Sequence, residues 1–283
     1  MSRREEILQK ILTIEAMPAV AAKAAGLLLD QDSDIADIVK TIEYDPGLAS
    51  NLLRMANSAY YGFRDPISSI RDAMVRLGTD QIYKMIVSWG FSPMVQQSVP
   101  GYGLAPGKLW EHSIGVAVGA EQLASDLHLV PPDHAFTAGL LHDIGKIALG
   151  AFVEVDIDSI LEIVNQHKVS FEVAEQQVLG IDHAEAGAAL LEHWNLPQGV
   201  VEATRWHHQP DSFEEESLVV DLVHVADTMC LMGGIGAGIE GTDYYTSRKT
   251  ASRLHLDIIT GDAVISEILA KLDSICGLFA ATE

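Results

Sequence analysis

The run GLLHDIGKIAL, residues 139–149, places three side chains that can do chemistry inside an apolar segment: His142, Asp143 and Lys146. A charge in such surroundings is unfavourable by several kcal/mol unless it is paired or bound to a metal. His142 and Asp143 are expected on one helix, about 100° apart, so that both reach one ion. Lys146 follows one turn later and could contact an anion bound at that ion. A catalytic metal centre, a structural metal centre and a buried ion pair all fit this segment.

Other imidazoles and one carboxylate occur in similar apolar contexts in the second half of the chain. They are His112 in KLWEHSIGVAVGA, His183 in GIDHAEAGAALLEHW, His207 and His208 in TRWHHQPD, and Asp227 in LVVDLVHVADTMCLM. Each of them alone is more often an ordinary core or surface residue than a ligand. Together with the HD pair they make seven groups at the edges of five expected helices. Imidazoles and carboxylates suit iron, manganese, zinc or nickel.

The elements that position these residues are predicted to be helices throughout. The periodicity and capping residues predict helices near 18–29, 34–41, 45–56, 69–78, 79–95, 108–126, 133–149, 157–167, 171–179, 183–194, 197–207, 217–232 and 262–279. No alternating segment is long enough for a strand, and no repeat is present. The run QSVPGYGLAPG, residues 97–107, holds three glycines and two prolines and predicts a boundary between two helical parts.

Composition narrows the functional classes. The 283 residues are 48% hydrophobic and carry a net charge of −22, from 18 basic and 40 acidic side chains. This balance disfavours nucleic acid and anionic membranes as partners. Two cysteines form no disulfide framework, the first residues, MSRREEILQK, lack the apolar segment of a signal peptide, and no apolar run is long enough to cross a membrane. We expect a cytoplasmic protein that binds neither nucleic acid nor membrane.

The order H…HD…H…HH…D, centred on HDIGK, resembles the HD superfamily of metal-dependent phosphohydrolases. The stretches MPAVAAKAAGLLLD, NSAYYG and SSIRDAMVRLG make the wider match closer to the HDOD domain, an HD-related output domain of bacterial signalling proteins. The resemblance covers residues 14–212. It implies an all-α fold in which an N-terminal helical lobe, residues 14–96, packs on an HD-type lobe from about residue 108, with the C-terminal helices of residues 213–283 completing that lobe.

The resemblance also implies a site for two divalent transition-metal ions, most plausibly iron, manganese or nickel, with zinc a further option. Asp143 would bridge the two ions, and Asp143 and Lys146 would be the catalytic residues, with Lys146 stabilising phosphoryl charge. The remaining ligands form two sets, His112, His142 and Asp227 for one ion, and His183, His207 and His208 for the other.

Two departures from the related HD-GYP cyclic-dinucleotide phosphodiesterases limit the expected chemistry. After His207 and His208 the chain reads QPDSFEEES, without a GYP triplet. Lys108 stands one turn before His112, where a third metal would need a carboxylate. Neither a trinuclear centre nor hydrolysis of cyclic di-GMP is therefore expected.

Three interpretations remain open at this level. The first is a regulatory protein whose metal site is structural or senses a ligand, with a signalling protein or a phosphate-containing ligand as its partner. The second is a phosphohydrolase acting on a nucleotide or another phosphate ester. The third is a buried charged cluster without metal. His224, one turn before Asp227, is expected to be structural rather than to orient a ligand, and the oligomeric state is not predicted.

Overall fold

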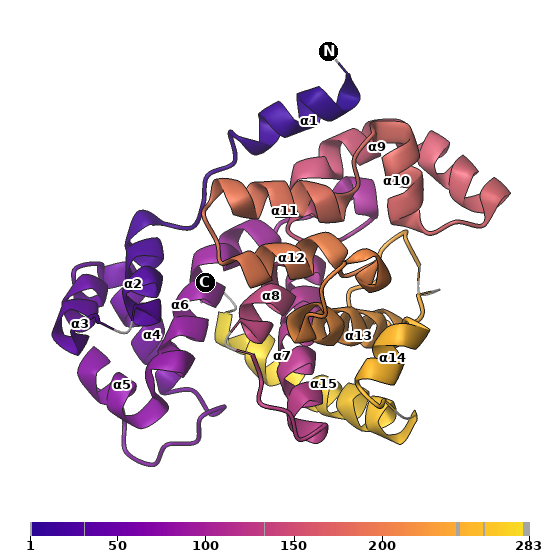
Figure 1. Ribbon diagram of the computed structural model, residues 1–283. Coiled ribbons are helices and arrows are strands. Elements are labelled where there is room, and N and C mark those ends of the chain that lie inside the picture. The colour runs from indigo at the N-terminus through magenta and orange to yellow at the C-terminus, as the bar shows by residue number, and fades with distance from the viewer. Residues whose placement is uncertain (1, 31, 133, 242–243, 257, 280–283) are drawn as a thin grey trace. The chain divides into compact units, whose positions relative to one another are not determined.

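The fold is all-α, as predicted. The computed structural model describes residues 2–30, 32–132, 134–241, 244–256 and 258–279. Within those residues the only β pairing is one isolated bridge, between Val99 and Leu104. The helices in chain order are α1 (Arg3–Ile11), α2 (Ala19–Leu29), α3 (Ile35–Glu43), α4 (Pro46–Ala56), α5 (Ile70–Leu77), α6 (Thr79–Val95), η1 (Pro100–Tyr102), α7 (Lys108–Asp126), α8 (Ala135–Leu141), α9 (Gly145–His167), α10 (Phe171–Leu179), α11 (His183–His193), α12 (Gln198–Trp206), η2 (Pro210–Ser212), α13 (Leu218–Met232), α14 (Arg248–Arg253) and α15 (Ile258–Phe279) (Figure 1).

The chain divides into two compact units. The first comprises Met1–Ile14 and Val95–Leu272, and the second comprises Glu15–Met94 and Asp273–Glu283. Among the residues with described coordinates, no helix combines the length and the apolar character needed to cross a bilayer.

The helices of the second unit begin where the sequence places their caps. The side chains of Asp34, Asp45 and Ser69 each accept a hydrogen bond from a backbone N–H in the first turn of α3, α4 and α5 respectively. The helices bury one apolar face each, and Ile42 and Leu48 are fully inaccessible to solvent. This unit therefore follows directly from the amphipathic pattern of its sequence.

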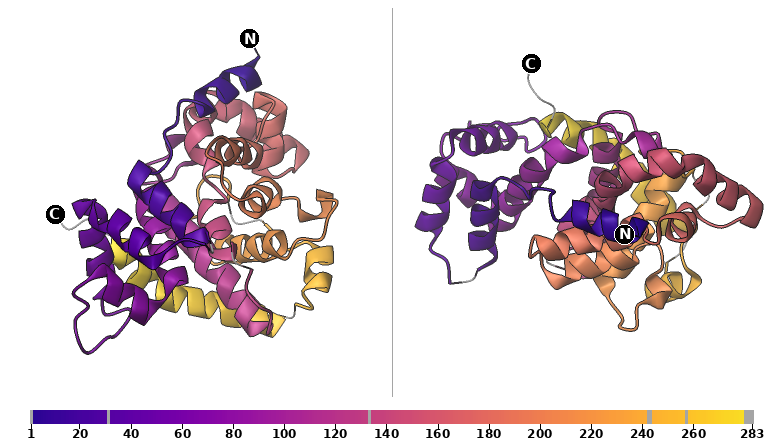
Figure 2. Two further views of the ribbon diagram at one scale, coloured as in Figure 1. Left: turned by 60° about the vertical axis from the view of Figure 1, so that its left-hand side comes forward. Right: turned by 90° about the horizontal axis from the view of Figure 1, so that it is seen from above.

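In the first unit, six helices pack against one another. Helix α7 packs on α8 and α13, α11 packs on α9 and α12, and α12 also packs on α8 and α13 (Figures 1 and 2). Glycines permit the closest approaches. A Cβ on Gly139 of α8 would lie 2.7 Å from the Ala117 Cα of α7, and one on Gly145 of α9 would lie 1.9 Å from the backbone oxygen of His183. These contacts bring the helix ends together at the candidate site.

The predicted helices 133–149 and 157–167 are wrong in one respect that matters for the site. The chain breaks at His142–Ile144 instead, where backbone bonds of the i→i+3 type replace helical ones, and α9 then runs without interruption from Gly145 to His167. His142 and Asp143 thus lie in a turn between two helices rather than on one helix. The predicted gap between residues 149 and 157 does not occur, because the apolar face of α9 continues through Phe152 and Val153.

Three further elements differ from the prediction. Helices α1 and α14 were not predicted, and α15 begins at Ile258 rather than near residue 262. Helix α1 is short and largely polar, and a complete capping box between Ser2 and Glu5 starts it. Arg3 and Arg4 join it to the rest of the first unit through ion pairs with Asp156 and Glu185, at 2.7 and 2.5 Å. Such tertiary contacts leave no periodic signal in the sequence.

Candidate metal centre

The structure brings the seven side chains proposed as metal ligands to one place in the first unit. His112 comes from α7, His142 and Asp143 from the turn before α9, and His183 from the first position of α11. His207 and His208 directly follow α12, and Asp227 lies on α13. Six of them are at most 2% exposed, and the His208 side chain is 6% exposed.

The ligand atoms form two groups. One contains His112, His142 and Asp227, and the other contains Asp143, His183, His207 and His208. Within each group every pair of ligand atoms lies within 4.8 Å. Ligands of a single ion are this close to one another, so each group has the dimensions of one metal site.

Backbone carbonyls fix the orientation of three of the imidazoles. The Nδ1 atoms of His112, His142 and His207 lie 2.9, 2.7 and 2.7 Å from the carbonyl oxygens of Ile235, Gly139 and Thr204 respectively. A carbonyl oxygen only accepts, so each Nδ1 carries the hydrogen. In the neutral ring, Nε2 then presents a lone pair to the centre, as metal-binding histidines do.

Lone pairs face one another without a donor between them. The Nε2 atoms of His112 and His142 are 3.3 Å apart, and both are acceptors in the neutral rings. The Nε2 atom of His207 is buried and has no hydrogen-bond partner. The facing acceptors of His112 and His142 repel one another unless a cation, either a proton or a metal ion, lies between them. The Nε2 atoms of His183 and His208 are 2.9 Å apart, a distance at which the Nε2–H tautomer of His208 donates to His183.

The Asp143 carboxylate faces both groups. Its Oδ2 atom lies 3.5 and 3.4 Å from the Nε2 atoms of His112 and His142. Its Oδ1 atom lies 3.5 and 3.7 Å from the Nε2 atoms of His183 and His207. One oxygen per group is the arrangement of a carboxylate that can bridge two ions.

The electrostatics reflect a site that needs positive charge. Burial alone would lower the pKa of His142, but attraction by Asp143 and Asp227 outweighs it and raises that pKa to about 10. The same balance, with Glu175 as the main attracting charge, raises the pKa of His183 to about 9. Burial lowers the pKa of His207 to about 3. In Asp143, burial opposes ionisation, but Lys146 and His142 hold its pKa well below the usual range.

Lys146 is buried between two carboxylates. Its Nζ atom lies 2.7 Å from Asp143 Oδ2 and 2.5 Å from Glu240 Oε1, and its side chain is 3% exposed. Burial disfavours the ammonium, but the two carboxylates outweigh it and raise the pKa of Lys146. The lysine is therefore charged, and it touches the carboxylate that faces both groups.

Three residues that the sequence interpretation did not single out support the centre. Glu175 of α10 accepts from the backbone N–H of His183 at 2.9 Å and lies 2.7 Å from its Nδ1. Its other oxygen accepts from the Tyr102 hydroxyl. The apolar face of α10 could have revealed Glu175, which stands one turn after Phe171, whereas Glu240 follows a glycine-rich segment that carries no such signal.

His224 contacts the backbone around the centre rather than a ligand side chain. Its Nδ1 lies 2.5 Å from the carbonyl oxygen of His207, and its Nε2 accepts from the backbone N–H of Ser247 at 2.9 Å. It thus connects α13 with the segment after α12 that carries His207 and His208, and with Ser247 at the start of α14.

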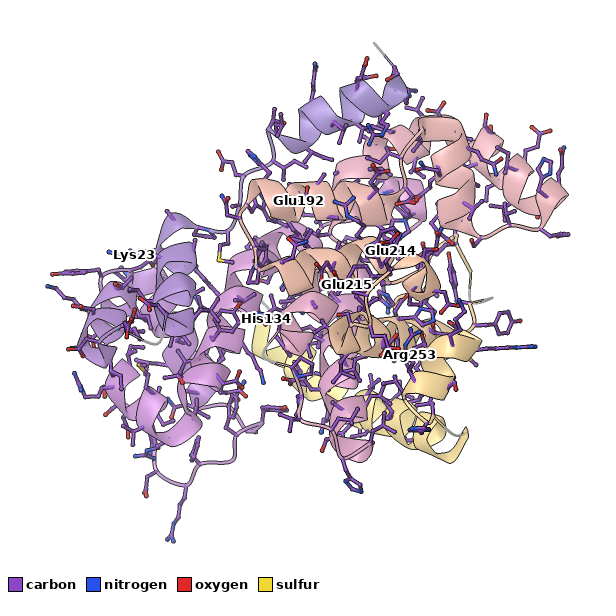
Figure 3. All side chains as sticks on the ribbon, in the orientation of Figure 1. Lys23, His134, Glu192, Glu214, Glu215 and Arg253 are labelled. Carbon is purple, nitrogen blue, oxygen red and sulfur yellow. The ribbon has the colours of Figure 1, made fainter. Side chains whose placement is uncertain are left out.

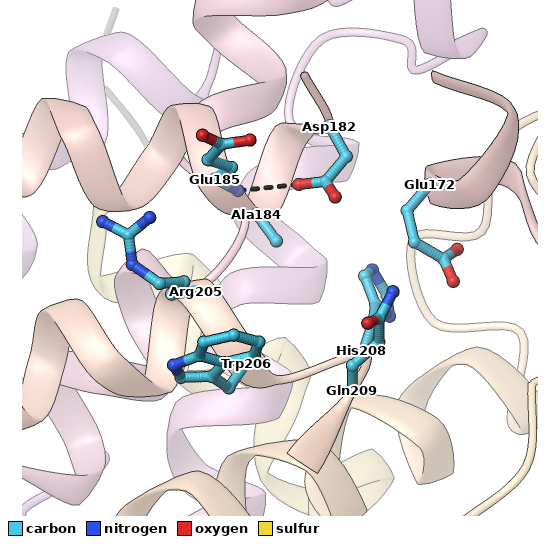
Figure 4. Close-up of a pocket in the computed structure, with 8 residues that line it drawn as sticks. All are labelled: Glu172, Asp182, Ala184, Glu185, Arg205, Trp206, His208 and Gln209. Atoms are coloured by element: carbon cyan, nitrogen blue, oxygen red, sulfur yellow. Dashed lines mark hydrogen bonds between the residues drawn. The ribbon is translucent and has the colours of Figure 1, made fainter. Parts of the chain in front are cut away.

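Besides facing the centre, His208 lines a pocket of about 290 Å³ (Figure 4). The remaining lining residues are Glu172, Asp182, Ala184, Glu185, Arg205, Trp206 and Gln209. Three carboxylates and one guanidinium give this pocket a negative character, and Arg205 is itself paired with Glu192 at 2.8 Å. Through His208 the centre meets this pocket.

Comparisons with known proteins agree with this architecture. The family model of the HDOD domain matches residues 14–210. The crystal structure of an HDOD domain protein of unknown function from Geobacter sulfurreducens is 27% identical, with a TM-score of 0.71 over 98% of this chain and 96% of that one. The structure of a candidate phosphohydrolase from Shewanella amazonensis is similar in fold, with 21% identity and a TM-score of 0.73 over 97% and 98% of the two chains.

A curated relative is longer than this chain. An uncharacterised protein of Treponema pallidum is 26% identical over 225 residues, which is 78% of this chain but 43% of that protein. The chain therefore spans less than half of that relative. Asp227, Glu240 and the helices from α13 onward lie beyond the end of the family match.

Proposed function

The chain belongs to the HDOD domain family, and from this premise we propose that it is a regulatory protein of bacterial signalling whose HD-type site holds two divalent transition-metal ions. The residues that would hold one ion are His112, His142 and Asp227, and those that would hold the other are His183, His207 and His208. Asp143, whose two oxygens face the two groups, would serve both. The observation that carries this proposal is the set of inward-facing Nε2 lone pairs around the two oxygens of Asp143.

The donor set fits iron, manganese or nickel, and it also accommodates zinc. The fit rests on the buried, unpartnered Nε2 atom of His207 and on the two acceptors of His112 and His142, which a cation would satisfy. When bound, such a pair of ions would supply Lewis acidity for phosphate-ester chemistry. The chain itself orients the imidazoles through their Nδ1 atoms and holds a lysine ammonium beside the bridging carboxylate.

The closed character of the centre favours a structural or sensing role over rapid turnover. Apart from His208, the proposed ligands are at most 2% exposed, and Glu240 neutralises the ammonium of Lys146. The partner of such a protein is then another signalling protein or a phosphate-containing ligand. Hydrolysis of a nucleotide or another phosphate ester is the second candidate function, and the buried ammonium of Lys146 beside Asp143 is the observation that favours it.

Elemental analysis of the purified protein tests the metal proposal. We expect about two transition-metal ions per chain in the wild type and a loss of both in Asp143→Ala, because this carboxylate serves both groups. Asp158→Ala on α9 is a matched control, since Asp158 is exposed and distant in sequence from the ligands. Folded wild-type protein without bound metal would contradict the proposal.

A hydrolysis screen separates the two candidate functions. The wild type is incubated with phosphomonoesters, nucleotides and cyclic nucleotides beside Asp143→Ala. A regulatory protein releases no phosphate above the level of the variant. Turnover that Asp143→Ala abolishes would establish the hydrolase instead, and turnover that survives in the variant comes from a contaminant or from another site.

A further inference from the structure

A loop of the first unit reaches over the candidate metal centre and contacts it at several points. This capping loop, Gly233–Ser247, connects α13 with α14, and its residues 233–241 and 244–247 are described. The carbonyl oxygen of Ile235 accepts from His112 Nδ1, and the backbone N–H of Ser247 donates to His224. The ring of Tyr244 stacks on that of His208, with centroids 5.3 Å apart. Both ends of the loop are thus fixed to residues of the centre.

The fit between the loop and the rest of the unit is close. The backbone N–H of Ile239 donates to the carbonyl oxygen of Tyr102 at 2.9 Å. A Cβ on Gly238 would lie 2.2 Å from that same oxygen, and one on Gly236 would lie 2.5 Å from the Cβ of His112. The glycines of this loop therefore allow its backbone to lie directly against the elements that carry the centre, and they set the position of Glu240.

Glu240 is the acidic group that the loop inserts. Its side chain is 2% exposed, and its Oε1 atom pairs with Lys146 at 2.5 Å. Its Oε2 atom is buried and has no hydrogen-bond partner. A buried carboxylate with one unsatisfied oxygen is unfavourable, so the ammonium of Lys146 is what retains it.

Glu240 also separates Lys146 from solvent. It lines a pocket of about 460 Å³, together with residues of the α9–α10 connection such as Lys168 and Ser170 and with Tyr244 and Tyr245 of the capping loop. The side chain of Glu240 is 2% exposed although the residue as a whole is half-buried, so its backbone lines the pocket while its carboxylate lies beneath, against the ammonium. An anion entering by this pocket would therefore reach Lys146 only if residue 240 moved.

We propose that Lys146 forms the binding position for a phosphate-type anion and that Glu240 closes this position as an internal competitor. This inference rests on the proposed function, since the anion would bind beside the metal pair. A ligand carrying a phosphate group displaces the carboxylate from Lys146 and, with it, the capping loop that touches His112 and His208. Ligand binding is thereby coupled to the conformation of residues 233–241 and 244–247, which provides a signal on the surface of the first unit.

Titration of purified, metal-containing protein with inorganic phosphate tests the inference by calorimetry. Glu240→Gln preserves the size of the side chain but removes its charge, so phosphate no longer competes with a carboxylate. We expect phosphate to bind at least about tenfold more tightly to Glu240→Gln than to the wild type. Lys146→Met in the Glu240→Gln background removes the ammonium, and this double variant is expected to lose the gain.

Glu215→Gln is the matched control, because it makes the same change of net charge at an exposed position of the first unit (Figure 3). It is expected to bind phosphate as the wild type does. The metal content of every variant is measured in parallel. Equal phosphate affinity in the wild type and in a metal-containing Glu240→Gln overturns the inference alone, whereas a wild type without metal overturns the proposed function. A gain that persists in the double variant assigns the anion to another position and also overturns the inference.

Discussion

At the scale of single residues, the centre is defined by what holds its imidazoles as much as by the imidazoles themselves. Sequence reasoning found all seven side chains that converge, because their types recur in apolar contexts and match a family order. It did not find Glu175 or Glu240, which act on the centre through His183 and Lys146. Contacts between residues distant in the chain decide such roles, and one sequence does not display them.

Replacing Glu175 should weaken metal binding without removing a proposed ligand. In Glu175→Gln the acceptor that orients His183 through its Nδ1 loses its charge, and the affinity for metal is expected to fall about 10–100-fold. Competition with a coloured chelator measures the affinity. Glu154→Gln, at an exposed position of α9, should leave it unchanged. Equal affinities in the two variants would show that Glu175 only fills space.

The raised histidine pKa values predict that the stability of the metal-free protein falls at high pH, whereas the stability of the metal-bound protein relative to it rises. Without metal, His142 and His183 are protonated below about pH 10 and 9 respectively. The pKa values of both histidines in the folded protein lie above the ordinary 6.5. The stability that their protons provide is therefore complete below pH 6.5 and is lost as the pH rises through 9 to 10. Metal binding requires neutral rings, so the metal-bound form gains relative stability over the same range.

Thermal denaturation of metal-free and metal-loaded protein between pH 7 and pH 10 checks this dependence. The melting temperature of the metal-free form should fall toward pH 10, and the difference between the two forms should widen. Calorimetry in two buffers of different ionisation enthalpy should also show that metal uptake releases protons. Parallel melting curves with no proton release would contradict the prediction.

At the scale of elements, the sequence predicted most helices well, since caps such as Asp45 and Ser69 and the apolar periodicity are local signals. It failed at the HD pair, where it joined α8 and α9 into one helix. At the break, Gly145 lies against the backbone of His183, a long-range contact that the local sequence does not display. His142 and Asp143 therefore lie where tertiary packing overrides the local preference for a continuous helix.

Gly145→Ala tests the contact between α9 and α11. The added Cβ would meet the backbone oxygen of His183 at 1.9 Å and the backbone nitrogen of Gly187 at 2.5 Å, so one helix must shift. We expect the free energy of unfolding to fall by about 1–3 kcal/mol and metal retention to decrease, because His183 moves with α11.

Gly26→Ala on α2 is the control for that substitution, because nothing lies within 4 Å of its Cβ. An alanine in this exposed helical position should stabilise the protein by about 0.4–1 kcal/mol. Urea denaturation of both variants measures the difference. A Gly145→Ala protein as stable as the wild type would show that α9 and α11 can separate freely.

At the scale of the whole molecule, the two units differ in what stabilises them. The second unit has an ordinary helical core, whereas the first surrounds a cluster of buried polar groups that repel one another without a cation. Removing metal with a chelator should therefore raise amide hydrogen exchange in α7, α8 and α11–α13 and leave α2–α5 unchanged. Mass spectrometry of peptic fragments resolves these segments. A uniform increase across both units would contradict the assignment of the metal to the first unit.

The discontinuous first unit has a consequence for how the protein is made. On the ribosome, α1 and the whole second-unit segment from Glu15 to Met94 emerge before any of the proposed ligands. His112 appears first and Asp227 last, with the capping loop still behind it. A nascent chain that met an ion early would offer only part of each group. Loading of the proposed metal pair would therefore follow the translation of α13, which carries Asp227.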